Sequence, residues 1–212
     1  SLAMGRDDSV LLYPLYGALP LSEQRKAVLP CEQGKRKVVL ATNIAETSVT
    51  IDGITLVVDS GYEKKAIFDV RTGLTRLVRQ RISQASQIQR AGRAGRLAAG
   101  QCWHLMSQEQ AQRARQQIEP EILSSDLTSL LMELKAWGGH ESRERDWLTP
   151  PPHPNLMQAQ RLLHTLAILD NEGNLTALGR HVATLPCEPR LGALLVNAQA
   201  QGADTLNRAA KL

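Results

Sequence analysis

The sequence predicts a mixed α/β fold with a mostly parallel sheet, followed by a smaller helical part. Up to about residue 118, short aliphatic and β-branched runs alternate with helical segments, as in strands joined by helical crossovers. After about residue 120, leucines recur at the i, i+3, i+4 and i+7 spacing of one helix face. Apolar residues make up 42% of the chain but aromatic residues only 3%, so we expect an aliphatic core.

Six strands are expected in the first part. Gly73 favours a tight turn within residues 69–73, so the fourth and fifth strands should form a β-hairpin inserted into the parallel fold. The predicted strands are Val10–Leu15, Lys37–Ala41, Ile54–Asp59, Tyr62–Phe68, Leu74–Gln80 and Gln101–Met106.

Helices are expected between these strands. Ser22 can cap a short helix that runs to about Leu29 and stops at Pro30. Ser83 or Ser86 can cap a second helix, and Ser107 a third, polar one that ends before Pro120.

The character of the chain changes near residue 120. Asp126 is the expected cap of a helix that stops at Gly138, and the proline-rich residues 139–154 should form a loop. Asn155 is the expected cap of the next helix, and residues 175–185 form either a short strand or a helix. Pattern alone therefore predicts a small helical domain.

The most informative run is Gln89-Arg90-Ala91-Gly92-Arg93-Ala94-Gly95-Arg96. If the helix continues through it, positions 89, 93 and 96 share one face. The glycines keep that face slim, and guanidinium groups bind phosphate oxygens bidentately. The run therefore suggests a phosphate site, although an exposed basic helix would have the same pattern.

A second motif, Ala41-Thr42-Asn43-Ile44-Ala45-Glu46-Thr47-Ser48-Val49-Thr50-Ile51-Asp52-Gly53-Ile54, lies between two apolar runs that resemble buried parallel strands. It should fall at the strand ends, where open α/β sheets bind ligands. Its hydroxyl, amide and carboxylate groups could serve a phosphate backbone or a ribose. The alternative is a polar turn.

In this order and about 35 residues apart, the two motifs resemble motifs V and VI of superfamily 2 helicases, in the DEAH-box (DEAH/RHA) branch and its bacterial HrpB type. The resemblance extends upstream to residues 15–20 and downstream to residues 120–123 and 175–180. It implies a second RecA-like domain over residues 1–118, a winged-helix-like domain over 119–186, and a truncated start of a helical ratchet-like domain over 187–212.

The resemblance implies an ATP site. Arg93 and Arg96 match arginine fingers on the γ-phosphate, and Gln89 matches a residue that positions the attacking water. Thr50 should lie near the nucleotide, and Asp52 should accept from the ribose hydroxyls. Many eukaryotic members stack a phenylalanine on the adenine at the position where this chain has Val28, so stacking is lost here.

The resemblance also implies a nucleic-acid interface. Residues that match phosphate–sugar contacts are Gly17, Thr42, Asn43, Thr47 and Ser48. The predicted hairpin matches one that separates strands in the family, and its expected phosphate contacts are Lys64, Lys65, Arg71, Arg76 and Arg79. A plain edge hairpin, with lysines that discourage aggregation, is the alternative.

Two ATPase motifs are absent from the sequence. It contains no G-x-x-x-x-G-K-[ST] loop and no Asp-Glu dipeptide of a DEAH box. In the family, a preceding RecA-like domain in cis holds the phosphates and Mg²⁺. We therefore expect an ATP-dependent helicase in the full-length protein, with no ATP or Mg²⁺ bound to this part and no activity from this part alone.

Charge and cysteine content narrow the class of protein. Residues 62–96 carry nine lysines and arginines against two carboxylates, a local charge of +7 within a chain of net charge +4. Three distant cysteines argue against disulfides and zinc, and no run is long enough to span a membrane. These features favour a cytoplasmic protein that has no metal site of its own and attracts polyanions. The resemblance implies that its partner is single-stranded nucleic acid, RNA in preference to DNA.

Two other functions stay open at this point. The basic stripe with a winged-helix-like unit could form a non-enzymatic nucleic-acid-binding module. The helical residues 120–212 could instead form an interaction scaffold, whose partner binding should survive high salt.

Overall fold

The computed structural model describes residues 9–47, 49–96, 98–138 and 147–211. The chain forms two compact units. Unit 1 comprises residues up to Lys65 together with Arg79–Ile118, and unit 2 comprises Ala66–Val78 together with the residues from Glu119 onwards. Each unit is described by itself.

Unit 1 contains four parallel strands in two pairs. The strands are β1 (Val10–Leu15), β2 (Arg36–Ala41), β3 (Leu56–Asp59) and β6 (Gln101–His104). β1 pairs with β2 in a register from Val10 opposite Arg36 to Leu15 opposite Ala41, and β3 pairs with β6. All four predicted strands form, but β3 and β6 are two residues shorter than expected.

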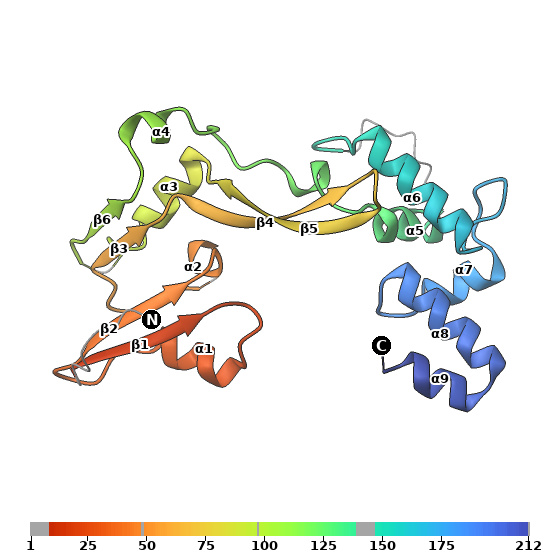
Figure 1. Ribbon diagram of the computed structural model, residues 1–212, viewed down its shortest axis with the longest axis horizontal. Coiled ribbons are helices and arrows are strands. Elements are labelled where there is room, and N and C mark those ends of the chain that lie inside the picture. Colours follow the sequence, from red (N-terminus) through yellow and green to blue (C-terminus); the bar gives the residue numbers. More distant parts are fainter. Residues whose placement is uncertain (1–8, 48, 97, 139–146, 212) are drawn as a thin grey trace. The chain divides into compact units, whose positions relative to one another are not determined.

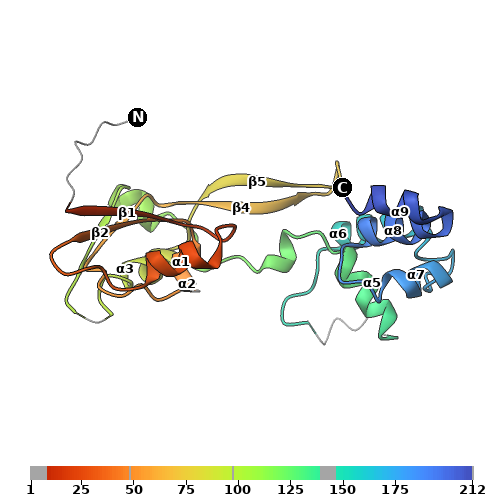
Figure 2. The ribbon, with the colours of Figure 1, turned by 90° about the horizontal axis from the view of Figure 1, so that it is seen from below.

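Three short helices of unit 1 lie between these strands in the sequence and a fourth follows β6 (Figure 1). They are α1 (Leu21–Val28), α2 (Ile44–Thr47), α3 (Gln84–Ala91) and α4 (Gln108–Gln112). α1 packs on β1 and α3 packs on β3, and Figure 2 shows α1 beside β1 and β2. The expected Ser22 cap is wrong, because α1 begins at Leu21 directly after Pro20.

The sequence had suggested strands that are buried on both sides, but the strands of unit 1 are not. Leu12 and Val38 face each other across β1 and β2 and are 61% and 43% exposed; Val58 and Trp103 do the same across β3 and β6 at 55% and 57%. Side chains alternate along a strand, so these residues mark a side of each pair that no helix of the described ranges covers.

The predicted hairpin forms from β4 (Tyr62–Asp69) and β5 (Leu74–Arg81). Asp69 O accepts from the backbone N–H groups of Thr72 and Gly73, which closes the turn, and Gly73 has φ +66°. Its base belongs to unit 1 and its distal part to unit 2.

Unit 2 is helical. Its elements are the 3₁₀ turn η1 (Glu121–Leu123) and the helices α5 (Thr128–Ala136), α6 (His153–Thr165), α7 (Ala177–Val182), α8 (Pro189–Gln201) and α9 (Ala203–Ala209). Leu131, Leu163, Ile168 and Val182 are at most 1% exposed and belong to one continuous aliphatic cluster. The expected aliphatic core is therefore found here.

Neither of the two caps expected in unit 2 is the N-cap of its helix. The N-cap of α5 is Leu127, although the carboxylate of the preceding Asp126 accepts from the backbone N–H of Thr128, the first residue of α5, at 2.9 Å. Asn155 does not cap α6, which begins two residues earlier at His153. Instead Asn155 is buried inside α6 and donates to Ser125 O at 3.1 Å.

The fold class expected from the sequence is confirmed: parallel strands with a hairpin, followed by a helical part. None of the helices in the described ranges is long and apolar enough to cross a membrane.

Candidate functional site

α3 starts at a side-chain cap and carries the basic run at its C-terminal end. Ser83 Oγ accepts from Ser86 N at 3.1 Å and so caps the helix. The prediction that Gln89, Arg93 and Arg96 share one helix face is wrong, because α3 ends at Ala91. Gly92 and Gly95 disfavour further helix, and the chain continues in tight turns in which Arg93 N donates to Arg90 O.

The turn after α3 brings two guanidinium groups to the 46–50 loop. Arg93 is half-buried and donates to the main-chain oxygens of Val49, at 3.2 Å, and Glu46. Arg96 is exposed and donates to Thr50 Oγ1 at 2.6 Å. Burial, and then the charge of Arg96, lower the pKa of Arg93 from its ordinary value. Two positive charges therefore lie close together on uncharged acceptors.

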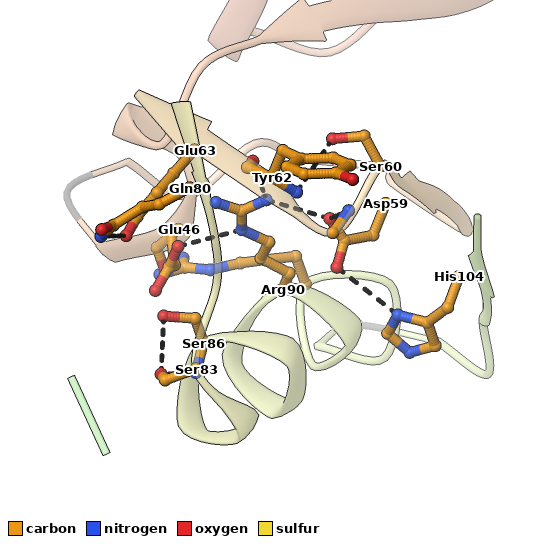
Figure 3. A network of polar contacts seen from close by, with 12 residues as sticks. Glu46, Asp59, Ser60, Tyr62, Glu63, Gln80, Ser83, Ser86, Arg90 and His104 are labelled. Carbon is orange, nitrogen blue, oxygen red and sulfur yellow. Dashed lines mark hydrogen bonds and ion pairs between the residues drawn. The ribbon is translucent and has the colours of Figure 1, made fainter. Parts of the chain in front are cut away.

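Arg90, on α3 itself, is held in a different way (Figure 3). Its Nε donates to Glu46 Oε2 at 3.0 Å, and its Nη1 donates to Asp59 Oδ1 at 2.9 Å and to Tyr62 O at 3.1 Å. The side chains of Arg90, Glu46 and Asp59 are 15%, 7% and 1% exposed. Burial lowers the pKa of Arg90, but the hydrogen bonds and charges of the two carboxylates outweigh it, so the pKa is raised.

Asp59 joins further parts of unit 1 to this network. Its Oδ1 also accepts from Gly61 N at 3.0 Å, and His104 Nδ1 lies 3.4 Å from its Oδ2. The Arg90 network, meaning Arg90, Glu46, Asp59, Tyr62 and His104, thus ties the 46–50 loop and α3 to the ends of β3, β4 and β6.

Two of the residues expected to contact a nucleotide, Thr50 and Asp52, lie between α2 and β3. Thr50 and Asp52 are exposed, and Asp52 N lies 3.4 Å from Val28 O. Asp52 therefore lies beside the end of α1, where Leu21 and Val28 border an open depression. An apolar wall, an exposed carboxylate and two guanidinium groups are the chemistry that adenine, ribose and phosphates require.

Two nucleotide predictions remain: Gln89 should position the attacking water, and this chain should have no metal site of its own. Gln89 is exposed on α3, and within the described ranges no hydrogen bond joins it to Arg93 or Arg96. Among the residues that the structure describes, no group of three or more His, Cys, Asp or Glu side chains is arranged to hold a metal ion. The chemistry of Thr50, Asp52 and the two arginines fits the parts of ATP.

The residues expected to contact nucleic acid lie mainly at the carboxyl ends of β1 and β2. Thr42, Asn43 and Thr47 are exposed, and Thr42 N donates to Leu15 O at 3.1 Å. Gly17 follows β1, is exposed and has open space where a side chain would lie. Ser48, the fifth of these residues, lies outside the described residues.

The basic residues expected on the hairpin are divided between the units. Lys64 is exposed and Lys65 half-buried in unit 1, whereas Arg71 and Arg76 are exposed in unit 2. The hairpin turn is packed, because Arg190 Nη2 donates to Gly73 O at 3.1 Å and Phe68 N donates to Ser124 O at 2.8 Å. A strand-separating role for this hairpin would therefore use its sides rather than the tip at Gly73.

Sequence reasoning missed the Arg90 network. Arg90 lies within the recognised run, but a helix-face argument selects positions 89, 93 and 96 and leaves position 90 out. The available signal was charge: Glu46 follows a strand, lies in an otherwise uncharged stretch of the second motif, and must be paired if it is buried.

Two protein-family models match the sequence. Residues 3–98 match the helicase conserved C-terminal domain, and residues 159–187 match the winged-helix form of the helicase associated domain HA2. The first match contains both sequence motifs, and the second falls in the helical part.

Individual proteins match over most of the chain. It is 59% identical over 198 residues to the ATP-dependent RNA helicase HrpB of Escherichia coli K12, covering 93% of this chain and 24% of that protein. It is 43% identical to the pre-mRNA-splicing factor ATP-dependent RNA helicase prp22 of Schizosaccharomyces pombe, covering 88% of this chain and 16% of that one. The crystal structure of Escherichia coli DEAH/RHA helicase HrpB matches with a TM-score of 0.88 and 58% identity, over 96% of this chain and 26% of that one. The chain thus spans about a quarter or less of the length of these relatives.

Proposed function

Because this chain belongs to the DEAH-box helicases of superfamily 2 and is of the HrpB type, we propose that it is part of an ATP-dependent RNA helicase. In this proposal it supplies one wall of the nucleotide cleft and part of the track for single-stranded RNA. A preceding RecA-like domain in cis supplies the P-loop, the DEAH box and the grip on Mg²⁺. The division at residues 118/119 and 186/187 and the cytoplasmic location belong to the same proposal.

The observation that carries the proposal is the way Arg93 and Arg96 are held. Both guanidinium groups donate to neutral oxygens, which phosphate oxygens can replace with stronger, charge-assisted hydrogen bonds. Two adjacent positive charges also repel one another, and an anion between them relieves that repulsion. Arg93 and Arg96 therefore act as arginine fingers that stabilise the negative charge of the transition state.

The remaining nucleotide contacts follow from the same loop. ATP, when bound, supplies the phosphoanhydride bond whose hydrolysis drives the cycle. Asp52 accepts hydrogen bonds from the ribose, Thr50 lies at the phosphate side, and Val28 offers an apolar but unstacked contact to the base. Gln89 holds the attacking water once the cleft is complete.

The nucleic-acid contacts lie on the other side of Glu46. Thr42, Asn43 and Thr47 are exposed polar groups next to the strand ends, and Gly17 leaves its backbone accessible. Together with Ser48 and the hairpin residues Lys64, Lys65, Arg71 and Arg76, they hold the phosphate–sugar backbone without reading bases.

Glu46 couples the two sites in this proposal. Its carboxylate binds Arg90, its main-chain oxygen accepts from Arg93, and its exposed neighbour Thr47 is one of the proposed nucleic-acid contacts. A change at the fingers therefore shifts the loop that touches the strand. This coupling is a local route for turning hydrolysis into movement along RNA.

The test is to supply the missing half. Joined in cis to the P-loop domain of the Escherichia coli relative, the chain should give ATP hydrolysis that single-stranded RNA stimulates, whereas the chain alone should give none. Hydrolysis by the chain alone would contradict the proposal. RNA binding by the joined protein without any ATPase activity would instead indicate a non-enzymatic nucleic-acid-binding module.

A further inference from the structure

A cysteine and a histidine lie side by side on β6. Cys102 and His104 are two residues apart on this strand, so their side chains point to the same side of it. Cys102 Sγ lies 3.6 Å from His104 Nε2. The cysteine is half-buried, and the histidine side chain is 34% exposed, so solvent reaches both. We call Cys102 and His104 the cysteine–histidine pair.

We propose that the cysteine–histidine pair binds a divalent cation of the zinc class through Cys102 Sγ and His104 Nε2. Zinc prefers thiolate and imidazole ligands, whereas Mg²⁺ and Ca²⁺ prefer oxygen. Water molecules complete the coordination of the ion. The proposal does not depend on the proposed helicase function.

The separation of the two ligand atoms fits one zinc ion. Zinc lies about 2.3 Å from a thiolate sulfur and about 2.0–2.1 Å from an imidazole nitrogen, with tetrahedral angles between its ligands. These values place the sulfur and the nitrogen about 3.5 Å apart. The distance from Cys102 Sγ to His104 Nε2 is 3.6 Å, so both atoms can reach the same ion without a change in the main chain.

Asp59 orients the imidazole for this role (Figure 3). The register of β3 and β6 places Asp59 opposite His104, and Asp59 Oδ2 lies 3.4 Å from His104 Nδ1. That oxygen is buried and accepts no hydrogen bond among the described residues, so a proton on Nδ1 is favoured. The neutral ring then has its lone pair on Nε2, the atom that faces Cys102. A carboxylate behind a metal-binding histidine is the usual arrangement in zinc sites.

The charge around the pair favours a cation. Within the Arg90 network, the carboxylates of Glu46 and Asp59 face one guanidinium group, so one negative charge is not balanced while His104 is neutral. Burial, and then the charge of Asp59, raise the pKa of Cys102. The thiol therefore keeps its proton until a cation takes the place of that proton, which passes to the solvent.

The cysteine–histidine pair differs from the zinc sites that the cysteine content excludes. The three cysteines are far apart along the chain, which argues against a site built from several thiolates. The pair needs one thiolate, and its two side-chain ligands are fewer than the three that were sought among the described residues. It should therefore bind zinc more weakly than a structural site with four protein ligands. The proposal departs from the expectation of a chain without a metal site of its own.

The test follows metal binding by absorption, with Co²⁺ as a coloured substitute for Zn²⁺. The parent protein is the chain with Cys31→Ser and Cys187→Ser, in which Cys102 is the remaining cysteine, in anaerobic buffer. Titration with Co²⁺ should produce a thiolate-to-cobalt charge-transfer band that saturates at one ion per chain, and Zn²⁺ should abolish this band. At about ten times its Kd, Zn²⁺ should also raise the melting temperature by about 3–5 °C, because it binds the folded state.

Matched variants of this parent identify the two ligands. Cys102→Ser should remove the charge-transfer band. His104→Gln should keep a band but weaken Co²⁺ binding at least about tenfold, since even the loss of a residue behind a metal ligand costs that much. The control His153→Gln changes an exposed histidine of unit 2 and should leave the band and the affinity unchanged. Circular dichroism of each variant shows that the fold is retained, and Cys102→Ser decides alone if His104→Gln does not fold.

Each contrary outcome has a defined meaning. A parent protein without a charge-transfer band, or a band that persists in Cys102→Ser, overturns the site. Unchanged Co²⁺ affinity in folded His104→Gln overturns the pairing with Cys102, and an equal loss in the control His153→Gln shows unspecific binding and overturns it as well. None of these measurements uses ATP or RNA, so failure of the proposed helicase function would leave their result unaffected.

Discussion

Arg90 and Arg93 lie one helical turn apart in the sequence, yet the protein holds them by opposite means. Arg90 is clamped between the buried carboxylates of Glu46 and Asp59. Among the described residues, the hydrogen-bond acceptors of Arg93 and Arg96 are neutral oxygens of Glu46, Val49 and Thr50. A single run of eight residues therefore contains one arginine that is fixed and two that can exchange partners.

If Arg93 and Arg96 act as proposed, the difference separates stability from function. Removing one partner of a buried ion pair costs about 3–5 kcal/mol because a charge stays buried and unpaired. Exchanging a main-chain oxygen for a phosphate oxygen costs little, since the new hydrogen bond is charge-assisted. Arg90 is thus suited to hold Glu46 in place. Arg93 and Arg96 are suited to exchange their neutral acceptors for the oxygens of a ligand.

The largest effect is expected at Arg93. In the protein completed with a P-loop domain, Arg93→Gln should lower the rate of ATP hydrolysis about 10³–10⁵-fold, the range seen for loss of an arginine finger. The free energy of unfolding should change little, because only bonds to neutral oxygens are lost. Steady-state ATPase assays and thermal melting measure the two quantities.

Arg93→Lys separates charge from shape. Lysine keeps the positive charge but has no planar fork, so it should recover only part of the rate. Full activity of Arg93→Gln would show that Arg93 is not a catalytic residue. The contrast between a structural Arg90 and a catalytic Arg93 would then be wrong.

The next effect is expected at Arg90 and appears in stability. Arg90→Gln leaves Glu46 and Asp59 buried without their cation and should lower the free energy of unfolding by about 3–5 kcal/mol. Urea unfolding of the chain measures it, with the exposed Arg161→Gln as a control that should change stability by less than about 0.5 kcal/mol. A loss at Arg90 no larger than in the control would mean that the network does not hold the loop.

The elements of the fold were largely predictable, but their surroundings were not. The strand at Val10–Leu15 and the hairpin follow from β-branched runs and a turn glycine, which are local signals. The exposure of Val38 and Leu40 on β2 depends on which layers cover the strand, and an apolar run does not contain that information.

The candidate site was also predictable where local signals carry it and not where tertiary contacts do. The pair Arg93 and Arg96 was predicted from residue type and spacing, although the helix expected to carry them stops at Ala91. The Arg90 network joins residues 31 and 44 positions apart in sequence. Such contacts are set by the tertiary fold, so no local pattern could have paired them.

A smaller effect is expected at Thr50, whose hydroxyl oxygen accepts a hydrogen bond from Arg96. Thr50→Val keeps the shape of the side chain and removes the acceptor of the 2.6 Å bond from Arg96 Nη1. Because both side chains are exposed, the free energy of unfolding should change by less than about 1 kcal/mol. The KM for ATP of the completed protein should change instead. A loss of stability as large as that of Arg90→Gln would show that Arg96 is fixed like Arg90.

The smallest effect on the fold is expected at Gly17. This position tests a contact of the backbone, whereas the preceding predictions test contacts of side chains. Nothing lies within 4 Å of a methyl group placed there, and its φ is not among the positive values, so Gly17→Ala should keep or slightly raise the free energy of unfolding. If a phosphate approaches this backbone, the methyl group should still weaken binding of single-stranded RNA. Gly61→Ala is the contrasting variant, because the φ of Gly61 is +74°, which L side chains rarely adopt, and its methyl group would meet the end of the Met106 side chain. Gly61→Ala should lower the free energy of unfolding. If Gly17→Ala leaves both stability and RNA binding unchanged, Gly17 is not one of the nucleic-acid contacts.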